Sequence, residues 1–382
     1  MSSSSGGGRW AWAEVDLAAI AHNVAVLRAT AAPSEVWAVV KANGYGHGAA
    51  AVARAALEAG AAGLCVALVQ EGVELREAGI GGRILVLSEQ PPELLAAAIA
   101  HDLELTVYTA GQLADLAAAG ARRHPVHLKI DTGMRRVGAP PAGAVVLAAA
   151  IAGADAVELV GVLTHLAQAD EPDDPYTDGQ LGAFATVLDE LTDAGYPAPA
   201  VHTANSAGLL AHPSSRQSFV RAGIAVYGIS PGPGVDALVE GLRPAMSLHA
   251  RVSFVKRVRS GERLSYGLRH RFATDTSVAT LPIGYADGVP RRLHAVGGEV
   301  LLGGVRRPIV GAITMDQLMV DCGDDHVEPG DHAVLIGAQG NECITAAEWA
   351  AKLDTIAYEI VCGISLRIER RSPPAGASSA GL

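Results

Sequence analysis

The chain of 382 residues carries 29 lysines and arginines against 40 aspartates and glutamates, a net charge of −11. This acidic balance, without a dense basic stripe, argues against nucleic-acid binding. The longest uncharged run, residues 137–154, contains two prolines and three glycines, so it makes a poor membrane-spanning helix and we expect no membrane association. The length suits a barrel of about 250 residues followed by a smaller domain.

The two ends of the chain and its cysteines indicate where the protein resides. Residues 1–9 lack the basic and apolar regions of a signal peptide and are expected to be a disordered leader, as residues 372–382 are expected to be a disordered tail. The 4 cysteines have no CxxC spacing and fit small core residues in a reducing cytoplasm. We therefore expect a cytoplasmic protein, and the histidine spacing predicts no metal site.

Up to about residue 240, short aliphatic runs alternate with Ala/Leu-rich stretches of helical period. Eight runs are predicted as buried strands: 36–40, 63–67, 83–87, 105–108, 126–130, 159–164, 200–203 and 219–224. The stretches between them predict helices at 16–28, 48–59, 69–78, 92–100, 110–119, 143–152 and 179–194. This alternation is typical of a parallel sheet covered by helices. It predicts an α/β fold, a (β/α)8 TIM barrel over residues 10–240, whose extreme N-terminal strand could instead join the second domain.

After residue 240 the residue pattern changes to alternating runs and turns, which predicts a mainly β C-terminal domain over residues 241–371. The predicted strands are 246–258, 277–283, 299–302, 309–310, 317–320, 332–336 and 365–369. One helix is predicted over 345–353, with Thr345 as its N-cap and Glu348 completing a capping box. The turn-rich segment 230–234 indicates the seam between the domains.

Lys41 closes the first predicted strand and is followed by glycines interleaved with Asn43, Tyr45 and His47. A lysine at the end of a buried strand is costly unless it is paired or used chemically, since burial favours the neutral amine. Two interpretations stay open from this residue alone: a side chain that reaches out to solvent, and a nucleophilic or basic amine.

In a TIM barrel the catalytic residues gather at the C-terminal ends of the strands, and phosphate commonly binds after strands 7 and 8. The unusual polar residues of this chain fall there: Lys41, Lys129, Asp131, Arg136, His165, Asn205, Ser206 and Arg221. Arg221 lies in an otherwise apolar segment and requires a partner, either an acidic neighbour or a ligand heteroatom. Ser206, Gly223 and the backbone around Ile224 suit a phosphate without any Walker sequence.

Other candidates have plain structural interpretations. His165 and His202, taken alone, fit satisfied core histidines. Tyr266 and Tyr285 stand beside glycines, where a tyrosine either packs over a turn or acts as an acid or base.

Seven segments, in chain order, resemble bacterial alanine racemases, which are pyridoxal 5′-phosphate (PLP) enzymes of fold type III. They are VVKANGYGHG (39–48), KIDTGMRR (129–136), HTANSA (202–207), RAGI (221–224), SYG (265–267), GYADG (284–288) and MDQ (315–317). The resemblance runs through both predicted domains, from about residue 10 to 370, and implies interconversion of L-alanine and D-alanine, which serves peptidoglycan synthesis.

The resemblance also implies residue roles. Lys41 would hold PLP covalently and act as one base, and Tyr266 of the partner subunit in a homodimer would be the opposite base. The cofactor would also contact Tyr45, Arg136, His165, Asn205, Ser206, Arg221, Gly223, Ile224 and Tyr358. Arg136 and Met315 would bind the substrate, Lys129 would be a carbamylated lysine, and Tyr285, Asp170 and Arg291 would line the entrance.

The chain departs from the family pattern at Arg135, which stands where glycine is usual, and at Ala312, which lacks the arginine often found near the entrance. Three alternatives to an alanine racemase remain: a racemase of another amino acid such as serine, a fold-related PLP amino-acid decarboxylase, and a non-catalytic PLP-binding protein. The decarboxylase lacks support because its cysteine-containing block is not found. The binding protein leaves the second domain unexplained.

Overall fold

The computed structural model describes residues 9–373 and divides the chain into two compact units. The barrel unit is Leu17–Arg243, and the β unit combines Met1–Asp16 with Pro244–Leu382. The division therefore lies later in the chain than the turn at 230–234. That turn stays in the barrel unit, where it leads into a 3-10 helix, Pro233–Val239, whose Val235 is buried.

The barrel unit is built on a nearly closed sheet of 8 parallel strands in the order β8-β7-β6-β5-β4-β3-β2-β9. Backbone hydrogen bonds from Ser218 to Val201 (2.9 Å) and from Arg221 to Ala204 (3.0 Å) connect its two edges. The predicted barrel is confirmed, and the strands lie within a few residues of the predicted runs. They are β2 (Glu35–Val39), β3 (Gly63–Val66), β4 (Arg83–Val86), β5 (Glu104–Val107), β6 (His124–Lys129), β7 (Val157–Leu163), β8 (Val201–His202) and β9 (Phe219–Ala222).

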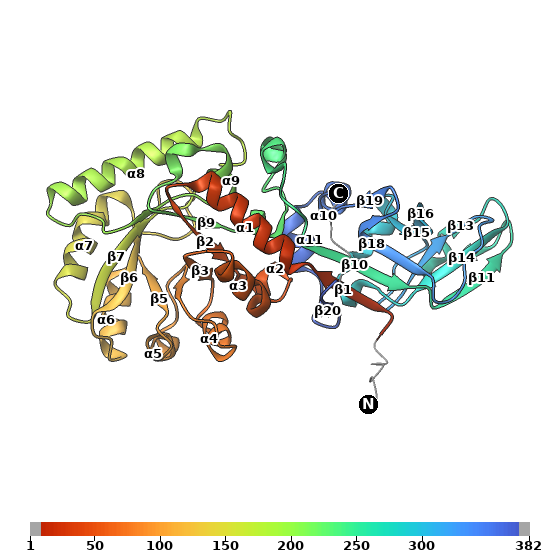
Figure 1. Ribbon diagram of the computed structural model, residues 1–382, viewed down its shortest axis with the longest axis horizontal. Helices are drawn as coiled ribbons and strands as arrows, with labels where there is room; N and C mark the ends of the chain where they lie inside the picture. Colours follow the sequence, from red (N-terminus) through yellow and green to blue (C-terminus); the bar gives the residue numbers. More distant parts are fainter. Residues whose placement is uncertain (1–8, 374–382) are drawn as a thin grey trace. The chain divides into compact units, whose positions relative to one another are not determined.

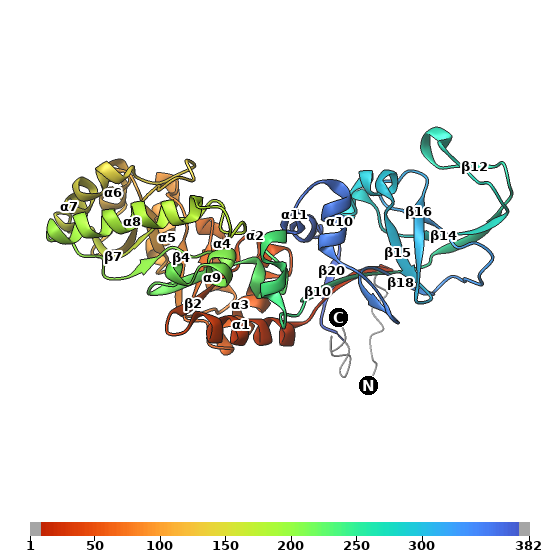
Figure 2. The ribbon, with the colours of Figure 1, turned by 90° about the horizontal axis from the view of Figure 1, so that it is seen from above.

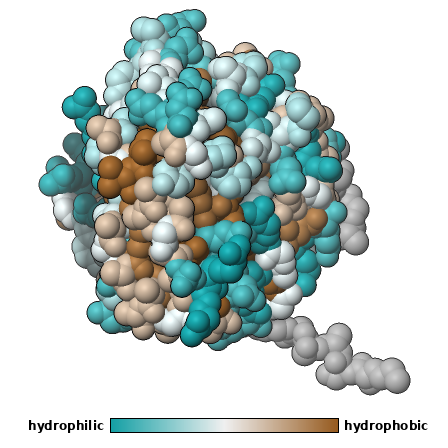
Figure 3. Space-filling model, turned by 90° about the vertical axis from the view of Figure 1, so that its left-hand side faces the viewer, coloured by the Kyte–Doolittle hydropathy of each residue, from teal (hydrophilic) through white to brown (hydrophobic). Residues whose placement is uncertain are grey.

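Helices surround this sheet, as Figures 1 and 2 show. They are α1 (Leu17–Ala31), α2 (Lys41–Tyr45), α3 (Ala49–Glu58), α4 (Val69–Glu77), α5 (Pro92–Ala100), α6 (Ala110–Ala118), α7 (Ala144–Ala152), α8 (Tyr176–Asp193) and α9 (Ser206–Ala211). Helix α7 consists entirely of apolar residues and leaves Val146 73% exposed, and hydrophobic residues reach the surface on this side of the molecule (Figure 3). Among residues 9–373 no helix is long and apolar enough to cross a membrane.

Aromatic rings fill the barrel interior near the start of the strands. Trp37 of β2 is fully buried and stacks on Phe219 of β9, with ring centroids 4.4 Å apart. Gly63 of β3 pairs with Trp37 in register, and a Cβ atom at Gly63 would lie 2.6 Å from the indole ring. The glycine therefore provides the space that the indole occupies.

We predict that Gly63→Ala destabilises the protein by about 1–3 kcal/mol, because a methyl group cannot enter this packed space without displacing Trp37. Urea denaturation measures the change. Gly182→Ala is the matched control: Gly182 lies exposed inside α8 with no atom near its Cβ position, and alanine there should stabilise the helix by about 1 kcal/mol. Equal stability of the parent and Gly63→Ala would contradict this packing.

The β unit contains a sheet of 10 strands in the order β11-β14-β17-β16-β15-β18-β10-β1-β20, with β19 paired to β18. The strands are β1 (Ala11–Val15), β10 (Met246–Arg251), β11 (Phe254–Val258), β14 (Thr276–Leu281), β15 (Glu299–Leu302), β16 (Val305–Val310), β17 (Leu318–Asp321), β18 (His332–Gln339), β19 (Glu342–Ile344) and β20 (Glu369–Arg371). A separate hairpin joins β12 (Arg263–Leu264) to β13 (His270–Arg271), and two helices complete the unit, α10 (Ala346–Leu353) and α11 (Ala357–Cys362).

Two elements of the β unit differ from the sequence predictions. Thr345 caps α10 by accepting a hydrogen bond from Glu348 N (3.0 Å), but the Glu348 carboxylate binds Arg306 and Lys352, so the capping box is incomplete. Most of the strand predicted at 365–369 is a turn closed by Ile368 N on Ser365 O (3.0 Å).

At the N-terminal end, Arg9 does not belong to a free leader, because its guanidinium pairs with the buried Asp287 carboxylate. The rest of the expected leader, residues 1–8, and residues 374–382 of the expected tail lie outside the described residues.

Candidate active site at the barrel mouth

Lys41 does not end the first barrel strand as the sequence suggests; it begins the turn that follows it. Strand β2 ends at Val39, and Ala42, Asn43 and Gly44 have φ values of +52°, +53° and +61°, so α2 is a left-handed turn. This conformation costs about 1–2 kcal/mol for each residue other than glycine. Such strain persists where the surroundings fix it, and it is often found at functional sites.

Several hydrogen bonds hold this turn in place. The Glu71 carboxylate of α4 accepts from Ala42 N (2.6 Å), and the Asn43 side chain accepts from Ala49 N (3.0 Å). The turn is also closed on itself by Gly48 N donating to Asn43 O (2.9 Å). Lys41 is therefore presented from a fixed backbone after β2.

Arg221 of β9 is buried, with 2% of its surface exposed, and its guanidinium is held by oxygen and nitrogen acceptors from β7 and β8 and the residues that follow them. Nη1 donates to His202 Nδ1 and His202 O, both at 2.8 Å. Nη2 donates to Thr164 O (2.8 Å), Thr203 O (2.9 Å) and His165 Nδ1 (3.3 Å). Burial lowers the pKa of Arg221 to about 10, so the group stays charged at neutral pH. The acidic partner considered from the sequence is not among the described contacts.

These bonds use the four N–H groups on the two terminal nitrogens of Arg221. Among residues 9–373, the fifth N–H group, on Nε, has no hydrogen-bond partner. The Nε atom is not fully buried, so this N–H group can be reached. The guanidinium therefore has its orientation fixed by protein groups while one donor remains for a ligand.

The residues predicted to bind phosphate lie together beside Arg221. Ser206 Oγ accepts from Gly223 N (2.8 Å) and Ala225 N (3.3 Å), which draws the start of α9 against the end of β9. A Cβ atom at Gly223 would lie 2.8 Å from Tyr45 Oη and 3.8 Å from Ser206 Oγ. The missing side chain at Gly223 therefore leaves room beside two hydroxyl groups and backbone N–H groups, which suits an anion.

Asn205 has a supporting position instead of a free amide. Its Oδ1 caps α9 by accepting from Gly208 N (2.9 Å), and its Nδ2 donates to Leu166 O (3.3 Å). Both ends of the amide are thus used by the backbone, so Asn205 positions Ser206 one residue further along.

Lys129 ends β6 in a cationic environment. Its side chain is buried, and burial together with the charges of Arg221 and Arg136 lowers its pKa to about 8. In the loop that follows, the Asp131 carboxylate accepts from Gly133 N and Arg135 N, both at 3.0 Å. Arg135, the departure from the family's glycine, has φ +55°, a conformation that favours glycine.

His165 lies on the same side of Arg221 as Thr164 and is an acceptor through Nδ1. Burial and the nearby positive charges, Arg221 and Lys129 foremost, hold its pKa well below the usual range, so the imidazole is neutral. The interpretation of His165 and His202 as simple core histidines is therefore incomplete, because both bind the guanidinium of Arg221.

In the β unit, one loop brings together three of the predicted residues. Ser265 Oγ donates to Ala312 O (2.9 Å), which fixes the turn that carries Tyr266. Tyr285 N donates to Thr314 O (3.0 Å), which holds Tyr285 beside the loop that carries Met315. Tyr266, Tyr285 and Met315 are 75%, 42% and 53% exposed.

The remaining predicted residues lie apart in the chain. Arg291 begins a 3-10 helix of the β unit, and Tyr358 lies in α11 of the same unit. Asp170 belongs to the barrel unit, where the space left by Gly232 and Gly234 allows close contact with it.

Comparison with solved structures defines the class of protein. Alanine racemase from the D-cycloserine-producing Streptomyces lavendulae is 42% identical, with a TM-score of 0.90 over 96% of this chain and 97% of that chain. Alanine racemase from Bacillus anthracis with bound L-Ala-P is 41% identical, with a TM-score of 0.91 and 96% of each chain covered. The barrel and β unit are therefore those of an amino-acid racemase.

Sequence comparison identifies the family. Residues 15–231 match the alanine racemase N-terminal domain, and residues 245–372 match the alanine racemase C-terminal domain. The alanine racemase of Symbiobacterium thermophilum is 48% identical over 369 residues, covering 95% of this chain and 97% of that protein. That of Thermobifida fusca is 46% identical over 367 residues, covering 94% and 97%. The chain belongs to the alanine racemase family.

We predict that the lowered pKa of Lys129 affects stability. Between pH 8 and 10.5 the unfolded chain holds a proton on Lys129 that the folded protein has released, so stability rises with pH in this window. In CO₂-free buffer, the free energy of unfolding of the parent should rise between pH 7.5 and 9.5 by about 2 kcal/mol more than that of Lys129→Met. Urea denaturation at both pH values measures this. The exposed-lysine control Lys256→Met should follow the parent; a constant difference between the parent and Lys129→Met contradicts the shift.

Proposed function

We propose that this enzyme interconverts L-alanine and D-alanine with pyridoxal 5′-phosphate, using Lys41 and Tyr266 of the partner subunit as opposed bases. The observation that carries the proposal is the set of hydrogen bonds that holds the two terminal nitrogens of Arg221, which we call the frame around Arg221. These bonds leave the Nε–H group as a donor at the barrel mouth. A rigid, singly available donor beside a hydroxyl-lined space suits a planar ring bearing a phosphate.

The residues at the barrel mouth fit three groups of PLP: the aldehyde, the phosphate and the pyridine nitrogen. The amine of Lys41 can bind the aldehyde carbon. The space at Gly223, with Ser206 Oγ and Tyr45 Oη near it, can accept the phosphate. The family resemblance adds Ile224 and Tyr358 as phosphate ligands. The Arg221 Nε–H can donate to the pyridine nitrogen. When bound, PLP supplies a conjugated ring that delocalises the electron pair left at the substrate Cα.

The chain's residues then move the protons. Racemisation requires that a proton leave Cα on one face and another arrive on the opposite face, so two groups must flank the substrate. Lys41 Nζ serves one face and Tyr266 Oη the other. Positioned acid and base groups contribute about 10²–10⁴-fold to such steps. Arg221 donates a hydrogen bond but retains its proton, so it leaves the ring nitrogen unprotonated and keeps electron withdrawal moderate.

The exposure of Tyr266 supports a homodimer with composite sites. A phenol that is 75% exposed on its own chain is poorly suited to proton transfer at carbon, because a working site excludes water. Met315 and Tyr285, on neighbouring loops, are also exposed. A second copy that covers these loops would complete each barrel mouth with Tyr266.

The surrounding residues take supporting roles. Arg136 and Met315 would bind the substrate carboxylate, and His165 would hold Arg221. Lys129 would be carbamylated: its neutral Nζ attacks the carbon of CO₂, an N–C bond forms and one proton is released. The lowered pKa provides the neutral amine, and the anionic product would balance the charges of Arg136 and Arg221.

The biological setting and the entrance are part of the same proposal. Tyr285, Asp170 and Arg291 would line the entrance for a small substrate, in a cytoplasmic enzyme whose D-alanine enters peptidoglycan. Racemisation of serine is the second candidate for substrate, since Tyr358 near the phosphate would leave room for a hydroxymethyl group.

We predict different effects for the loss of each base. In D₂O, the parent should exchange the α-proton of both alanine enantiomers. Lys41→Ala should lose the absorption band of the bound cofactor, and Tyr266→Phe should lower exchange from one enantiomer by at least about 10²-fold while the other still exchanges. NMR measures exchange. Equal exchange from both enantiomers in Tyr266→Phe contradicts the two-base proposal, and racemisation of another amino acid but not alanine contradicts the substrate.

We predict that Gly223→Ala weakens PLP binding by at least about tenfold, because the new methyl group fills the space beside Tyr45 Oη. Fluorescence titration of the apoenzyme with PLP measures the Kd. Gly182→Ala, distant on α8, should bind PLP as the parent does. Parent-like affinity of Gly223→Ala contradicts a phosphate at this position.

A further inference from the structure

A line of polar side chains crosses the barrel interior from Arg221 to the opposite end of the barrel. His202 Nδ1 accepts from Arg221 Nη1 (2.8 Å), and His202 Nε2 lies 3.0 Å from His127 Nδ1. His127 Nε2 lies 2.8 Å from Glu104 Oε2. Glu104, the first residue of β5, is held by Arg83, the first residue of β4, through contacts of 2.5 Å and 2.9 Å.

The two ends of this line fix the direction of every hydrogen bond within it. A guanidinium can only donate, so His202 Nδ1 carries no proton, and a carboxylate can only accept, so His127 Nε2 carries one. The remaining bond must then run from His202 Nε2–H to His127 Nδ1. Each histidine has one tautomer, and both are set by groups outside the ring.

Both imidazoles are neutral in this arrangement. Burial, above all, lowers the pKa of His127 and holds that of His202 well below the usual range. Burial raises the pKa of Glu104, but hydrogen bonds from His127 and Arg83 outweigh it, so the net pKa is lowered. Glu104 is therefore the anionic end of a line whose cationic end is Arg221, and the His127 contact is a hydrogen bond to a carboxylate and not an ion pair.

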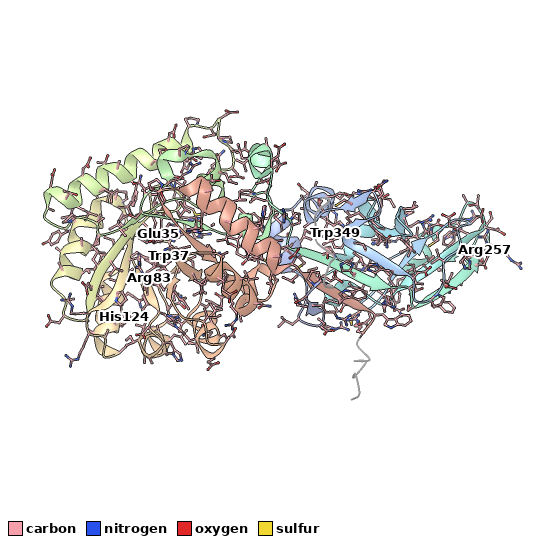
Figure 4. All side chains as sticks on the ribbon, in the orientation of Figure 1. Glu35, Trp37, Arg83, His124, Arg257 and Trp349 are labelled. Carbon is pink, nitrogen blue, oxygen red and sulfur yellow. The ribbon has the colours of Figure 1, made fainter. Side chains whose placement is uncertain are left out.

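Packing holds the line in position. His202 stacks on Phe219 with centroids 4.1 Å apart, and Phe219 stacks on Trp37. The Arg83 guanidinium lies 4.6 Å from the Trp37 ring centroid, and Figure 4 labels both residues within the barrel. Gly161 makes room for His127, since a Cβ atom there would lie 2.4 Å from His127 Nδ1.

We propose that Glu104 is a positioning residue for the racemase site: it holds the proton of His127 on Nε2 and, through His127 and His202, helps to fix the orientation of the Arg221 guanidinium. The inference rests on the proposed contact between Arg221 and the cofactor. Among residues 9–373 Arg221 has no carboxylate in direct contact, and Glu104 reaches it only through the hydrogen bonds of His127 and His202. Hydrogen bonds in such a chain polarise one another, so loss of the carboxylate is felt at the guanidinium.

The test compares Glu104→Leu, which removes both charge and acceptor, with Glu104→Gln, which keeps an acceptor. The holoenzyme, labelled with ¹⁵N-histidine, reports the tautomers of His127 and His202 by NMR. The parent should show both histidines protonated on Nε2 alone. In Glu104→Leu the His127 Nε2–H loses its acceptor, so this variant should lose the single tautomer of His127, shift the absorption band of the bound cofactor and lower kcat/KM at least about tenfold. Glu104→Gln should keep the tautomer and lower kcat/KM about threefold.

His124→Gln is the matched control, because His124 begins β6 at the same end of the barrel but binds Leu103 O and lies outside the line. It should leave the spectra of His127 and His202 and kcat/KM unchanged. Protonation of His127 on Nδ1 in the parent, or parent-like spectra and kinetics in Glu104→Leu, overturns the proposal. If Glu104→Leu does not fold, Glu104→Gln decides: kinetics equal to the parent overturn it. Failure of the PLP proposal itself would appear separately, as a parent without a cofactor band.

Discussion

The Arg221 guanidinium is buried with no contacting acid among residues 9–373, and this is the constraint on which the barrel mouth depends. Removing a charge from water costs several kcal/mol unless its hydrogen bonds are replaced. Here the carbonyl oxygens of Thr164, His202 and Thr203 and two imidazole nitrogens replace them. Because these acceptors belong to the ends of β7 and β8, the hydrogen bonds also tie β9 to its neighbours at the place where the sheet closes.

The other parts of the site are arranged by close backbone approach. Gly223 lets the start of α9 and the Tyr45 hydroxyl come near the end of β9. The left-handed turn at Lys41 is held by Glu71 and Asn43, which compensate for its unfavourable φ values. An amine, a guanidinium and the space at Gly223 are thus held in place by protein groups, which lowers the entropic cost of binding a ligand there.

The sequence predicts much of this arrangement because the signals are local. Continuous apolar runs mark the eight barrel strands, and Lys41, Lys129, Ser206 and Arg221 stand out as polar residues at their ends. His127 and Glu104 were not predicted, because they lie inside strands whose neighbours in space are far apart in the chain. A polar residue at a strand position gives no sign that it faces the barrel interior. A glutamate at the start of one predicted strand and a histidine inside the next, in a pair of otherwise apolar runs, is the signal that could have identified them.

Local patterns also fail where tertiary contacts compete for the same group. Glu348 fits a capping box, but Arg306 and Lys352 take its carboxylate. The run at 365–369 looks like a strand, yet only Glu369–Arg371 pairs with β1, and the residues before it form a turn. The left-handed turn after β2 cannot be anticipated from Ala42 and Asn43, because its stability comes from Glu71 on another helix.

The central claim is that Arg221 presents a hydrogen-bond donor, and no transferable proton, to the cofactor ring. The most direct measurement is the protonation state of the ring nitrogen in the holoenzyme, reconstituted with ¹⁵N-labelled PLP and examined by solid-state NMR. An unprotonated nitrogen that accepts a hydrogen bond is the result expected from the frame around Arg221. A protonated pyridinium nitrogen would contradict it.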